Sequence, residues 1–132
     1  MEDLLKIVLS RPSHPGNIGS SARAIKVMGF SNLALVKPKL FPHSEAEALA
    51  SGATDILESA SVFLELSDAV RGETMVYGLT ARPRHFALPV LTPRQAAEEM
   101  VKNPQKTALV FGSENGGLLN EEINFCHKLI TI

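Results

Sequence analysis

The sequence contains a single cysteine, no tryptophan and almost no excess of either charge. Cys126 cannot form a disulfide within the chain, and no secretory leader opens the sequence, so we expect a reducing, cytoplasmic location. The net charge of −1 argues against a protein held on nucleic acid mainly by bulk positive charge, although a local basic patch would still suffice to steer an RNA. No apolar run approaches the roughly 20 residues of a membrane span, and no membrane association is expected.

The residues that are present have the composition of an ordinary globular domain. Hydrophobic residues make up 45% of the 132 residues and charged residues 20%, so a core can form without a metal or a disulfide to stabilise it. No internal repeat, linker or low-complexity segment divides the chain. We expect one domain over residues 1–132.

Short apolar runs alternate with segments of helical spacing. The apolar runs predict strands over residues 6–9, 33–36, 74–79, 107–111 and 128–132. The helical spacing predicts helices over residues 18–28, 44–50, 67–70 and 92–101, with a short helix opening at Asn120. Apolar strands that lack strict alternation and are separated by helices indicate an α/β fold, with a mainly parallel sheet and helices on both faces.

The ends of the predicted helices carry local signals. Ser44 and Thr92 are expected as N-caps, the latter followed by Pro93 in the first helical position. Gly29 is a natural stop for the first helix. The buried face of that helix is expected to consist of Ile18, Ala22, Ile25 and Met28.

Ligand sites in parallel sheets lie at the carboxyl ends of the strands, and three unusual loops follow strands in this sequence. The first loop, residues 11–19, contains two glycines and leads to Arg23 on the following helix. Its glycines permit close backbone approach, and the start of the helix would offer free N–H groups to an anion. The same residues also fit a plain strand–helix turn with a solvated arginine.

The second loop, residues 80–85, places Arg82, Arg84 and His85 around a proline. This cationic tip suits phosphate oxygens, or it is simply solvated. The third loop, residues 111–118, opens from an apolar strand into three glycines around Glu114 and Asn115. It indicates either backbone packed against a ligand or a flexible turn.

Several common sites are missing from the sequence. The third loop has no Gly-Lys-Ser/Thr, and the first strand–helix junction has no Gly-x-Gly-x-x-Gly, so neither a Walker loop nor a standard dinucleotide site is expected. The histidines lack the close spacing of metal ligands, and no metal is expected. Cys126 is expected to be a small buried hydrophobic residue rather than a nucleophile.

Taken together and in this order, the three loops resemble those of the SPOUT-class RNA 2'-O-methyltransferases, and most closely the TrmJ-type tRNA methyltransferases of the TrmH-like family. The similarity covers almost the whole chain. Its most specific stretch is Arg-Pro-Ser-His-Pro-Gly-Asn-Ile-Gly at residues 11–19, continuing through Ala-Arg-Ala at 22–24 to Met-Gly at 28–29. Weaker matches are Ala-Ser-Gly-Ala at 50–53, Thr-Ala-Arg at 80–82, Arg-His at 84–85, Leu-Val-Phe-Gly at 109–112 with Glu114, Gly-Leu at 117–118 and Asn-Glu-Glu at 120–122.

The resemblance implies that the carboxyl-terminal part of the sheet is threaded into a trefoil knot, and that S-adenosyl-L-methionine binds within it. The residues that it places around this cofactor are Thr80, Ala81, Arg82, Gly112 and Ile132. Members of the family act as homodimers, with each site built from two chains.

The resemblance also implies roles in the reaction. Arg23 takes the position of the catalytic arginine, and Asn17 lies near the ribose. Asn17, Arg11 and Arg84 face the RNA, which is expected to be a tRNA modified in its anticodon loop. Because a guanidinium stays protonated, we expect Arg23 to orient the ribose 2'-oxygen rather than to accept its proton. Alignment and electrostatics then supply the catalysis without a metal.

Two features depart from the pattern of the family. Ser113 stands where relatives often carry arginine. The chain ends at Ile132, where relatives continue with a proline and a Ser-Leu-Asn segment that completes the knot and the cofactor pocket, so we expect residues 1–132 to be a truncated domain. A non-catalytic RNA-binding module on the same fold is therefore an alternative. A small-molecule enzyme that uses another nucleotide is a second alternative, disfavoured by the missing phosphate loop.

Overall fold

The structure, a computed structural model, describes residues 3–81 and 87–132. These residues form a seven-stranded sheet in the order β3-β2-β1-β6-β4-β7-β5, and every neighbouring pair of strands is parallel. The strands are β1 (Leu5–Ser10), β2 (Asn32–Val36), β3 (Ser61–Phe63), β4 (Met75–Thr80), β5 (Val90–Leu91), β6 (Thr107–Phe111) and β7 (Lys128–Thr131). The predicted parallel α/β fold is confirmed, while the trefoil knot stays a prediction.

Helices connect the strands. They are α1 (Pro15–Val27), α2 (Ser44–Ala50), α3 (Thr54–Glu58), α4 (Leu66–Ala69), α5 (Pro93–Lys102) and α6 (Asn120–Ile123), with the 3-10 turn η1 (Ser51–Ala53) between α2 and α3. Every helix of the sequence prediction is present. Four elements were not predicted, namely η1, α3, β3 and β5.

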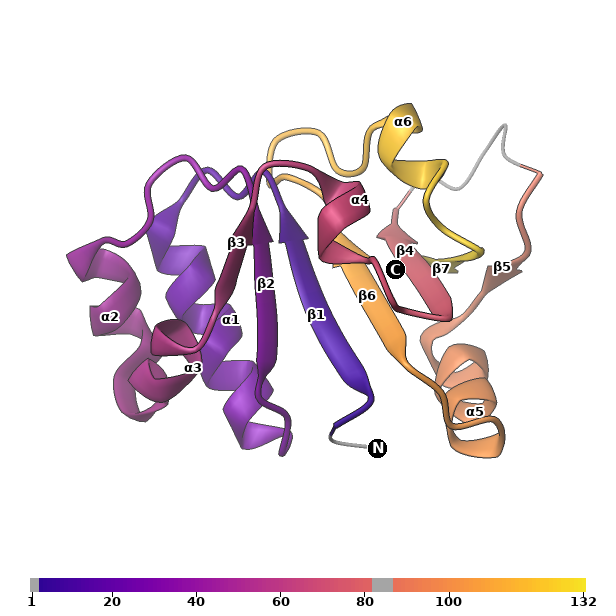
Figure 1. Ribbon diagram of the computed structural model, residues 1–132, viewed down its shortest axis with the longest axis horizontal. Helices are drawn as coiled ribbons and strands as arrows, with labels where there is room; N and C mark the ends of the chain where they lie inside the picture. The colour runs from indigo at the N-terminus through magenta and orange to yellow at the C-terminus, as the bar shows by residue number, and fades with distance from the viewer. Residues whose placement is uncertain (1–2, 82–86) are drawn as a thin grey trace.

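Both faces of the sheet are covered, as predicted. On one face α4 and α6 pack over the middle strands, where Val8, Val110 and Leu129 are fully buried. On the other face α1, α2 and α3 cover β1 and β2, while α5 covers β4 and β7 (Figure 1). Two apolar layers therefore enclose the sheet, and polar groups are left to gather at the ends of the strands.

Helix ends follow the local signals with two corrections. Thr92 caps α5 in a capping box with Gln95, as expected. For α2 the N-cap is His43 rather than Ser44, because the Nδ1 atom of His43 accepts the Glu45 N–H at 3.0 Å. Met28 was expected on the buried face of the first helix but is 71% exposed, because it is the C-cap residue from which the chain turns away at Gly29.

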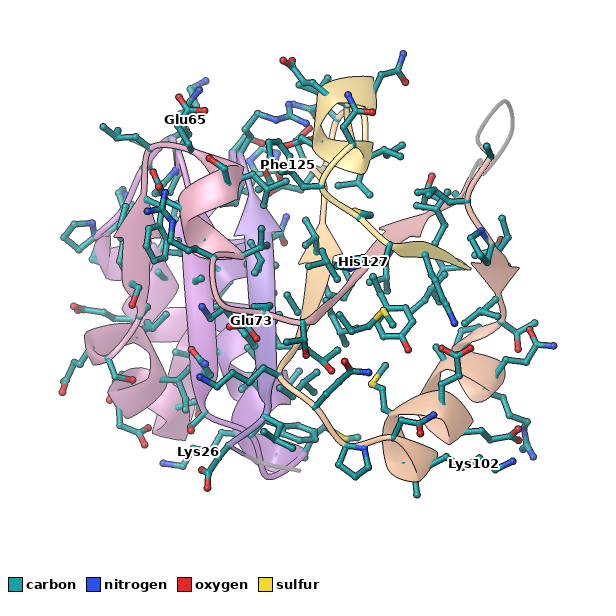
Figure 2. The ribbon with its side chains drawn as sticks, turned by 45° about the vertical axis from the view of Figure 1, so that its right-hand side comes forward. Lys26, Glu65, Glu73, Lys102, Phe125 and His127 are labelled. Atoms are coloured by element: carbon teal, nitrogen blue, oxygen red, sulfur yellow. The ribbon has the colours of Figure 1, made fainter. Side chains whose placement is uncertain are left out.

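The carboxyl ends of the strands form one edge of the molecule. In Figure 1 the arrowheads of β1, β2 and β3 point to the upper edge, where α6 also lies. Figure 2 shows Glu65 and Phe125 at this edge, whereas Lys26 and Lys102 lie at the opposite one. Because β6 pairs with both β1 and β4, the three predicted loops begin on adjacent strands.

Candidate functional site at the carboxyl edge of the sheet

A depression of about 770 Å³ opens at the carboxyl edge. Its walls come from the end of β4, the whole loop after β6, and the end of β7. Four of the residues predicted to surround the cofactor line it together: Thr80, Ala81, Gly112 and Ile132. The backbone N–H of Ile132 donates to the Thr80 carbonyl at 3.2 Å, which joins two of these walls. The fifth predicted residue, Arg82, lies outside the described residues.

The loop after β6 is a closely packed turn. A Cβ atom on Gly112 would overlap the carbonyl of Gly117 and the nitrogen of Leu118, so only glycine fits there. Ser113 and Gly117 form an antiparallel bridge, with the Gly117 N–H donating to the Ser113 carbonyl at 2.9 Å. Gly117 itself has a φ of +69°, which also favours glycine. The glycines of the third loop thus let the backbone fold back on itself beside the depression.

Glu114 joins this loop to the start of α1. Its carboxylate accepts the N–H of Ser13 at 3.0 Å, the N–H of His14 at 3.1 Å and the Nδ2 of Asn17 at 3.1 Å. Burial works to raise the pKa of Glu114, but these hydrogen bonds outweigh it and lower the pKa to about 2. The N–H groups of Ser13 and His14, just before α1, are therefore not open to an outside anion, because the Glu114 carboxylate already accepts them.

Arg11 is held by a second carboxylate. Its Nη2 lies 2.9 Å from one oxygen of Glu122 and also donates to the Gly117 carbonyl at 3.0 Å, while its Nε donates to the other Glu122 oxygen at 3.2 Å. The Ser10 hydroxyl and the Leu119 N–H donate to the same carboxylate. This pairing raises the pKa of Arg11. In this structure Arg11 ties the end of β1 to α6, with 29% of its side chain exposed, and its contact with RNA stays a prediction.

The Glu122 carboxylate is almost fully buried, with 6% of the residue exposed. Burial works to raise its pKa, but the hydrogen bonds from Arg11, the Leu119 N–H and Ser10 lower it overall. Glu122 is therefore a paired, ionised group inside the protein. Sequence reasoning missed this role, although Glu122 belongs to the Asn-Glu-Glu stretch that carries part of the family resemblance.

A second depression, of about 360 Å³, lies beside the first and shares Gly112 and Glu114 with it. Its other walls are Leu9, Pro12 and one side of α1, comprising Asn17, Ser20, Ser21 and Ala24. Arg23 is exposed on α1 and lines neither depression. Within the described ranges 3–81 and 87–132, the Arg23 side chain forms no hydrogen bond or ion pair. The structure therefore groups Asn17 with the loop after β6 and leaves Arg23 apart. Arg84 and His85 lie outside the described residues.

The remaining candidates give no further chemistry at this edge. Cys126 is buried, and burial raises the pKa of its thiol to about 12, as expected of a structural residue. The Nδ1 atom of His127 accepts the Val76 N–H at 2.8 Å. Among the residues that the structure describes, no group of three or more His, Cys, Asp or Glu side chains is arranged to hold a metal ion. None of the described helices is both long and apolar enough to cross a bilayer.

A parallel sheet with a glycine-lined depression at its carboxyl edge places the protein among α/β proteins that bind small molecules at the ends of their strands. The SpoU rRNA methylase family matches residues 4–132, and the chain belongs to this family.

Curated relatives are similar over nearly all of the chain. The tRNA (cytidine/uridine/adenosine-2'-O-)-methyltransferase TrmJ of Pseudomonas aeruginosa is 48% identical over 129 residues, which cover 96% of this chain and 50% of the relative. The tRNA (cytidine/uridine-2'-O-)-methyltransferase TrmJ of Escherichia coli K12 is 45% identical over 130 residues, covering 97% of this chain and 53% of the relative. The chain thus spans about half the length of the relatives that it matches.

Solved structures share the fold. A probable methylase family protein from Haemophilus influenzae superposes with a TM-score of 0.93 at 42% identity, covering 98% of this chain and 55% of the other. TrmJ from Z. mobilis ZM4 gives a TM-score of 0.92 at 36% identity, covering 96% of this chain and 57% of the other. An AdoMet-bound rRNA methyltransferase from Sinorhizobium meliloti, at 22% identity, shares the fold with a TM-score of 0.74, covering 100% of this chain and 48% of the other.

Proposed function

We propose that the protein transfers a methyl group from S-adenosylmethionine to a ribose 2'-hydroxyl of tRNA. The observation that carries this proposal is the depression in which Thr80, Ala81, Gly112 and Ile132 meet. These residues come from three separate segments, and the relatives at 45% and 48% identity are named as tRNA 2'-O-methyltransferases. An enzyme with the relatives' activity needs a cofactor pocket, and in a parallel sheet such a pocket lies at the carboxyl ends of the strands, where this depression is.

The depression fits the size and chemistry of the cofactor. Its volume of about 770 Å³ lies within the range of pockets that bury small molecules. The loop of residues 112–117 lines it and contains three glycines, so that backbone N–H and C=O groups there could recognise an adenine edge. When bound, S-adenosylmethionine supplies a methyl group on a positively charged sulfur, which is a strong alkyl donor. Thr80, Ala81, Gly112 and Ile132 would hold it, with Arg82 as the further residue that the resemblance adds.

The residues of the chain then have to align a ribose hydroxyl and stabilise charge on its oxygen. A hydroxyl is a weak nucleophile, so most of the catalysis comes from orientation and electrostatics. Arg23 stays protonated and would orient the 2'-oxygen and the adjacent phosphate, while the hydroxyl proton leaves to water or to the RNA. Asn17, on the wall of the adjoining depression, would contact the same nucleotide.

The site would be completed by a second copy of the chain. Arg23 is exposed and lines neither depression of its own chain, which favours the homodimer that the resemblance implies. In such a dimer the Arg23 of one protomer would reach the depression of its partner. A tRNA substrate also agrees with the cytoplasmic location that the sequence predicts.

The test combines binding and turnover in the natural protein that carries this chain. S-adenosylhomocysteine should bind in calorimetric titration, and labelled methyl groups should pass to tRNA but not to the 2'-deoxy analogue of the target. Arg23→Ala should leave the fold and cofactor binding intact and lower methyl transfer at least about a hundredfold, the scale of one lost preorganised contact. Near wild-type turnover in this variant would remove Arg23 from the reaction.

The alternative, a non-catalytic RNA-binding module, gives a different result in the same experiment. Such a module would bind tRNA without binding S-adenosylhomocysteine. The depression around Gly112 is the observation that disfavours this alternative, because a module that only binds RNA has no use for a separate pocket of that size.

A further inference from the structure

The loop between β2 and α2, residues 37–43, lies beside the loop after β1 at the carboxyl edge. The two loops leave the sheet at neighbouring positions, because β1 and β2 are parallel and paired. The Arg11 N–H donates to the Val36 carbonyl at 2.7 Å, and the Lys39 N–H donates to the Pro12 carbonyl at 3.0 Å. Since Pro12 lines the second depression, the backbone of Lys39 is bonded to a residue of its wall.

The order of the strands arranges the loops of this edge in a row. The first depression lies at the ends of β4, β6 and β7, and the second lies between the loop after β6 and one side of α1. In the order β2-β1-β6-β4, the loop of residues 37–43 comes next beyond β1. Neighbouring strands are only about 4.8 Å apart, so the backbone of an RNA with one nucleotide in the second depression is close enough to reach this loop.

Two lysines of this loop have charges that the protein leaves largely unneutralised. Lys39 is exposed, and its side chain forms no hydrogen bond or ion pair in the part of the chain that the structure describes. The Nζ atom of Lys37 lies 3.8 Å from a Glu65 oxygen, and these side chains are 53% and 64% exposed, so the pair contributes little. By contrast, Lys26 at the opposite edge lies 2.9 Å from Asp55.

The backbone of Lys37 adopts a conformation that favours glycine. Its φ is +48°, in the left-handed region that disfavours residues with a side chain. Arg11 has a φ of +56° at the corresponding position after β1, and Glu122 binds its side chain at 2.9 Å. No described residue binds Lys37 at hydrogen-bond distance. The fold therefore uses the cation at Arg11 but not the cation at Lys37, and strained residues of this kind gather at functional sites.

We propose that residues 37–39 form a phosphate-binding surface, on which Lys37 and Lys39 contact the RNA backbone next to the nucleotide in the second depression. This inference rests on the proposed function and adds to it the course of the RNA away from the cofactor. A lysine ammonium binds phosphate as a point charge, and phosphate contacts fix the position of a nucleic acid without reading its sequence. The surface should therefore raise the affinity for tRNA without selecting a base.

The test compares two pairs of lysines in the natural protein that carries this chain. Lys37→Gln with Lys39→Gln removes both charges at the carboxyl edge. Lys102→Gln with Lys106→Gln is the matched control, because these lysines are also exposed and their side chains have no hydrogen bond or ion pair among the described residues. Lys102 lies at the opposite edge (Figure 2), and Lys106 directly precedes β6 at its amino end. Binding of an unmodified tRNA transcript is measured between about 50 and 200 mM salt, with S-adenosylhomocysteine present.

The salt dependence identifies phosphate contacts. The logarithm of the affinity for single-stranded nucleic acid falls with the logarithm of the salt concentration by about 0.7 for each contact. Lys37→Gln with Lys39→Gln should therefore lower the slope by about 1.4 and weaken binding roughly 10–30-fold at about 100 mM salt. The control pair should change the slope by less than about 0.3. The kcat/KM for tRNA should fall with the affinity, while the KM for S-adenosylmethionine stays within about threefold of the wild type.

Lys37→Gly separates the charge of this residue from its backbone. Glycine suits the φ of +48°, so the variant should melt no lower than the wild type while its salt slope falls by about 0.7. A lower melting temperature together with the loss of slope would assign Lys37 a structural role and overturn the inference.

The inference is also overturned if the slope falls in Lys37→Gln with Lys39→Gln by less than about 0.7 more than in the control pair, since 0.7 is the value for one contact. Equal weakening in both pairs would mean that the tRNA responds only to net charge. Failure of the proposed function is a separate result, in which the wild type neither binds S-adenosylhomocysteine nor methylates tRNA.

Discussion

Two carboxylates, Glu114 and Glu122, hold the loops of the carboxyl edge by accepting hydrogen bonds from other elements. Glu114 binds the loop before α1, and Glu122 binds Arg11 at the end of β1. The two differ in environment, since Glu122 is buried and Glu114 is largely exposed. At the scale of single residues, Glu122 is therefore expected to matter for stability and Glu114 for the position of the loop before α1.

Replacing Glu122 with glutamine tests the stabilising role. The variant keeps the volume but leaves Arg11 without a charged partner and sets an NH2 group against neighbouring donors. We expect the free energy of unfolding to fall by about 2–3 kcal/mol at pH 7, measured by urea denaturation.

The same variant gives a pH dependence with a defined sign. The pKa of Glu122 in the folded protein lies below its ordinary value of 4.5, so its contribution is fully present above that pH and is lost as the pH falls through the lowered pKa. The stability difference between wild type and Glu122→Gln should therefore shrink on acidification below about pH 4.5. If the stability difference stays constant down to the pH at which the protein unfolds, Glu122 and Arg11 do not form an ionised pair.

At the scale of elements, α1 is placed by a close approach to α2. Gly19 on α1 leaves no room for a side chain, because a Cβ atom there would overlap the carbonyl of Ala46. Ala46 and Ala50 are both fully buried at this contact. Since Asn17 and Arg23 are carried on α1, the small residues between the two helices set the position of the two residues that are proposed to face the substrate.

Gly19→Ala should destabilise the protein by about 2 kcal/mol. Overpacking against backbone costs roughly 1–3 kcal/mol, and the better helix propensity of alanine offsets only about 1 kcal/mol of the upper value. Gly16→Ala is the matched control on the same helix. Its Cβ would lie 2.8 Å from Leu49 Cδ1 and 2.9 Å from Glu45 Oε1, both at the ends of flexible side chains, so we expect a change below about 1 kcal/mol. A Gly19→Ala protein as stable as Gly16→Ala in thermal or urea melting would refute this account.

The loop after β6 gives a second pair of glycine variants. Gly112→Ala would force the loop apart at Gly117 and open the wall of the first depression, so affinity for S-adenosylhomocysteine should fall at least about tenfold in calorimetry, a loss of about 1.4 kcal/mol. Gly116→Ala meets no atom within 4 Å and should bind like the wild type. Equal affinity in both variants would place the cofactor elsewhere.

At the scale of the whole molecule, the position of Arg23 bears on the number of chains in one site. Arg23 lies outside both depressions of its own chain, whereas Gly112 lines both of them. If a homodimer completes each site with the partner's arginine, defects at these two positions should complement each other.

Mixing Arg23→Ala and Gly112→Ala subunits tests this arrangement. Each mixed dimer would contain one site with both defects and one site with neither. Random exchange makes about half of the dimers mixed. At a cofactor concentration too low for Gly112→Ala to turn over, about a quarter of wild-type methyl transfer should therefore return after the two impaired proteins are unfolded and refolded together. Each variant refolded alone is the control. No recovery, with native mass spectrometry showing mixed dimers, would mean that Arg23 acts within its own chain.

Local patterns predicted most of the fold, because long elements leave a periodic signal. The strand β6 has the predicted bounds, residues 107–111, and the helix α5 has the predicted N-cap, Thr92. Four short elements were missed: α3 has five residues, η1 and β3 three each, and β5 two. Segments of that length contain fewer than two periods of the helical or strand pattern, which is too short to be recognised in the sequence. They form because longer neighbouring elements pack against them.

The candidate site was predictable in part. The glycines of the third loop indicated close backbone approach, and the depression with Gly112 on its wall agrees with that interpretation. The partners of the charged residues were not predictable. The resemblance marked Arg11 as facing RNA but gave no sign of its ion pair with Glu122, and nothing near the start of α1 in sequence indicated that Glu114 would accept its N–H groups.

Which partner each charge meets depends on the order of the strands. Arg11 and Glu122 are 111 residues apart in sequence, and Asn17 and Glu114 are 97 apart. They meet because β6 inserts beside β1, with Phe111 level with Leu9, so that the loops after both strands leave the sheet side by side. Helix periodicity, caps and apolar runs are local and can be read from neighbouring residues. The pairing of parallel strands is long-range, and its free energy comes from burying both faces of the sheet, which no local segment encodes.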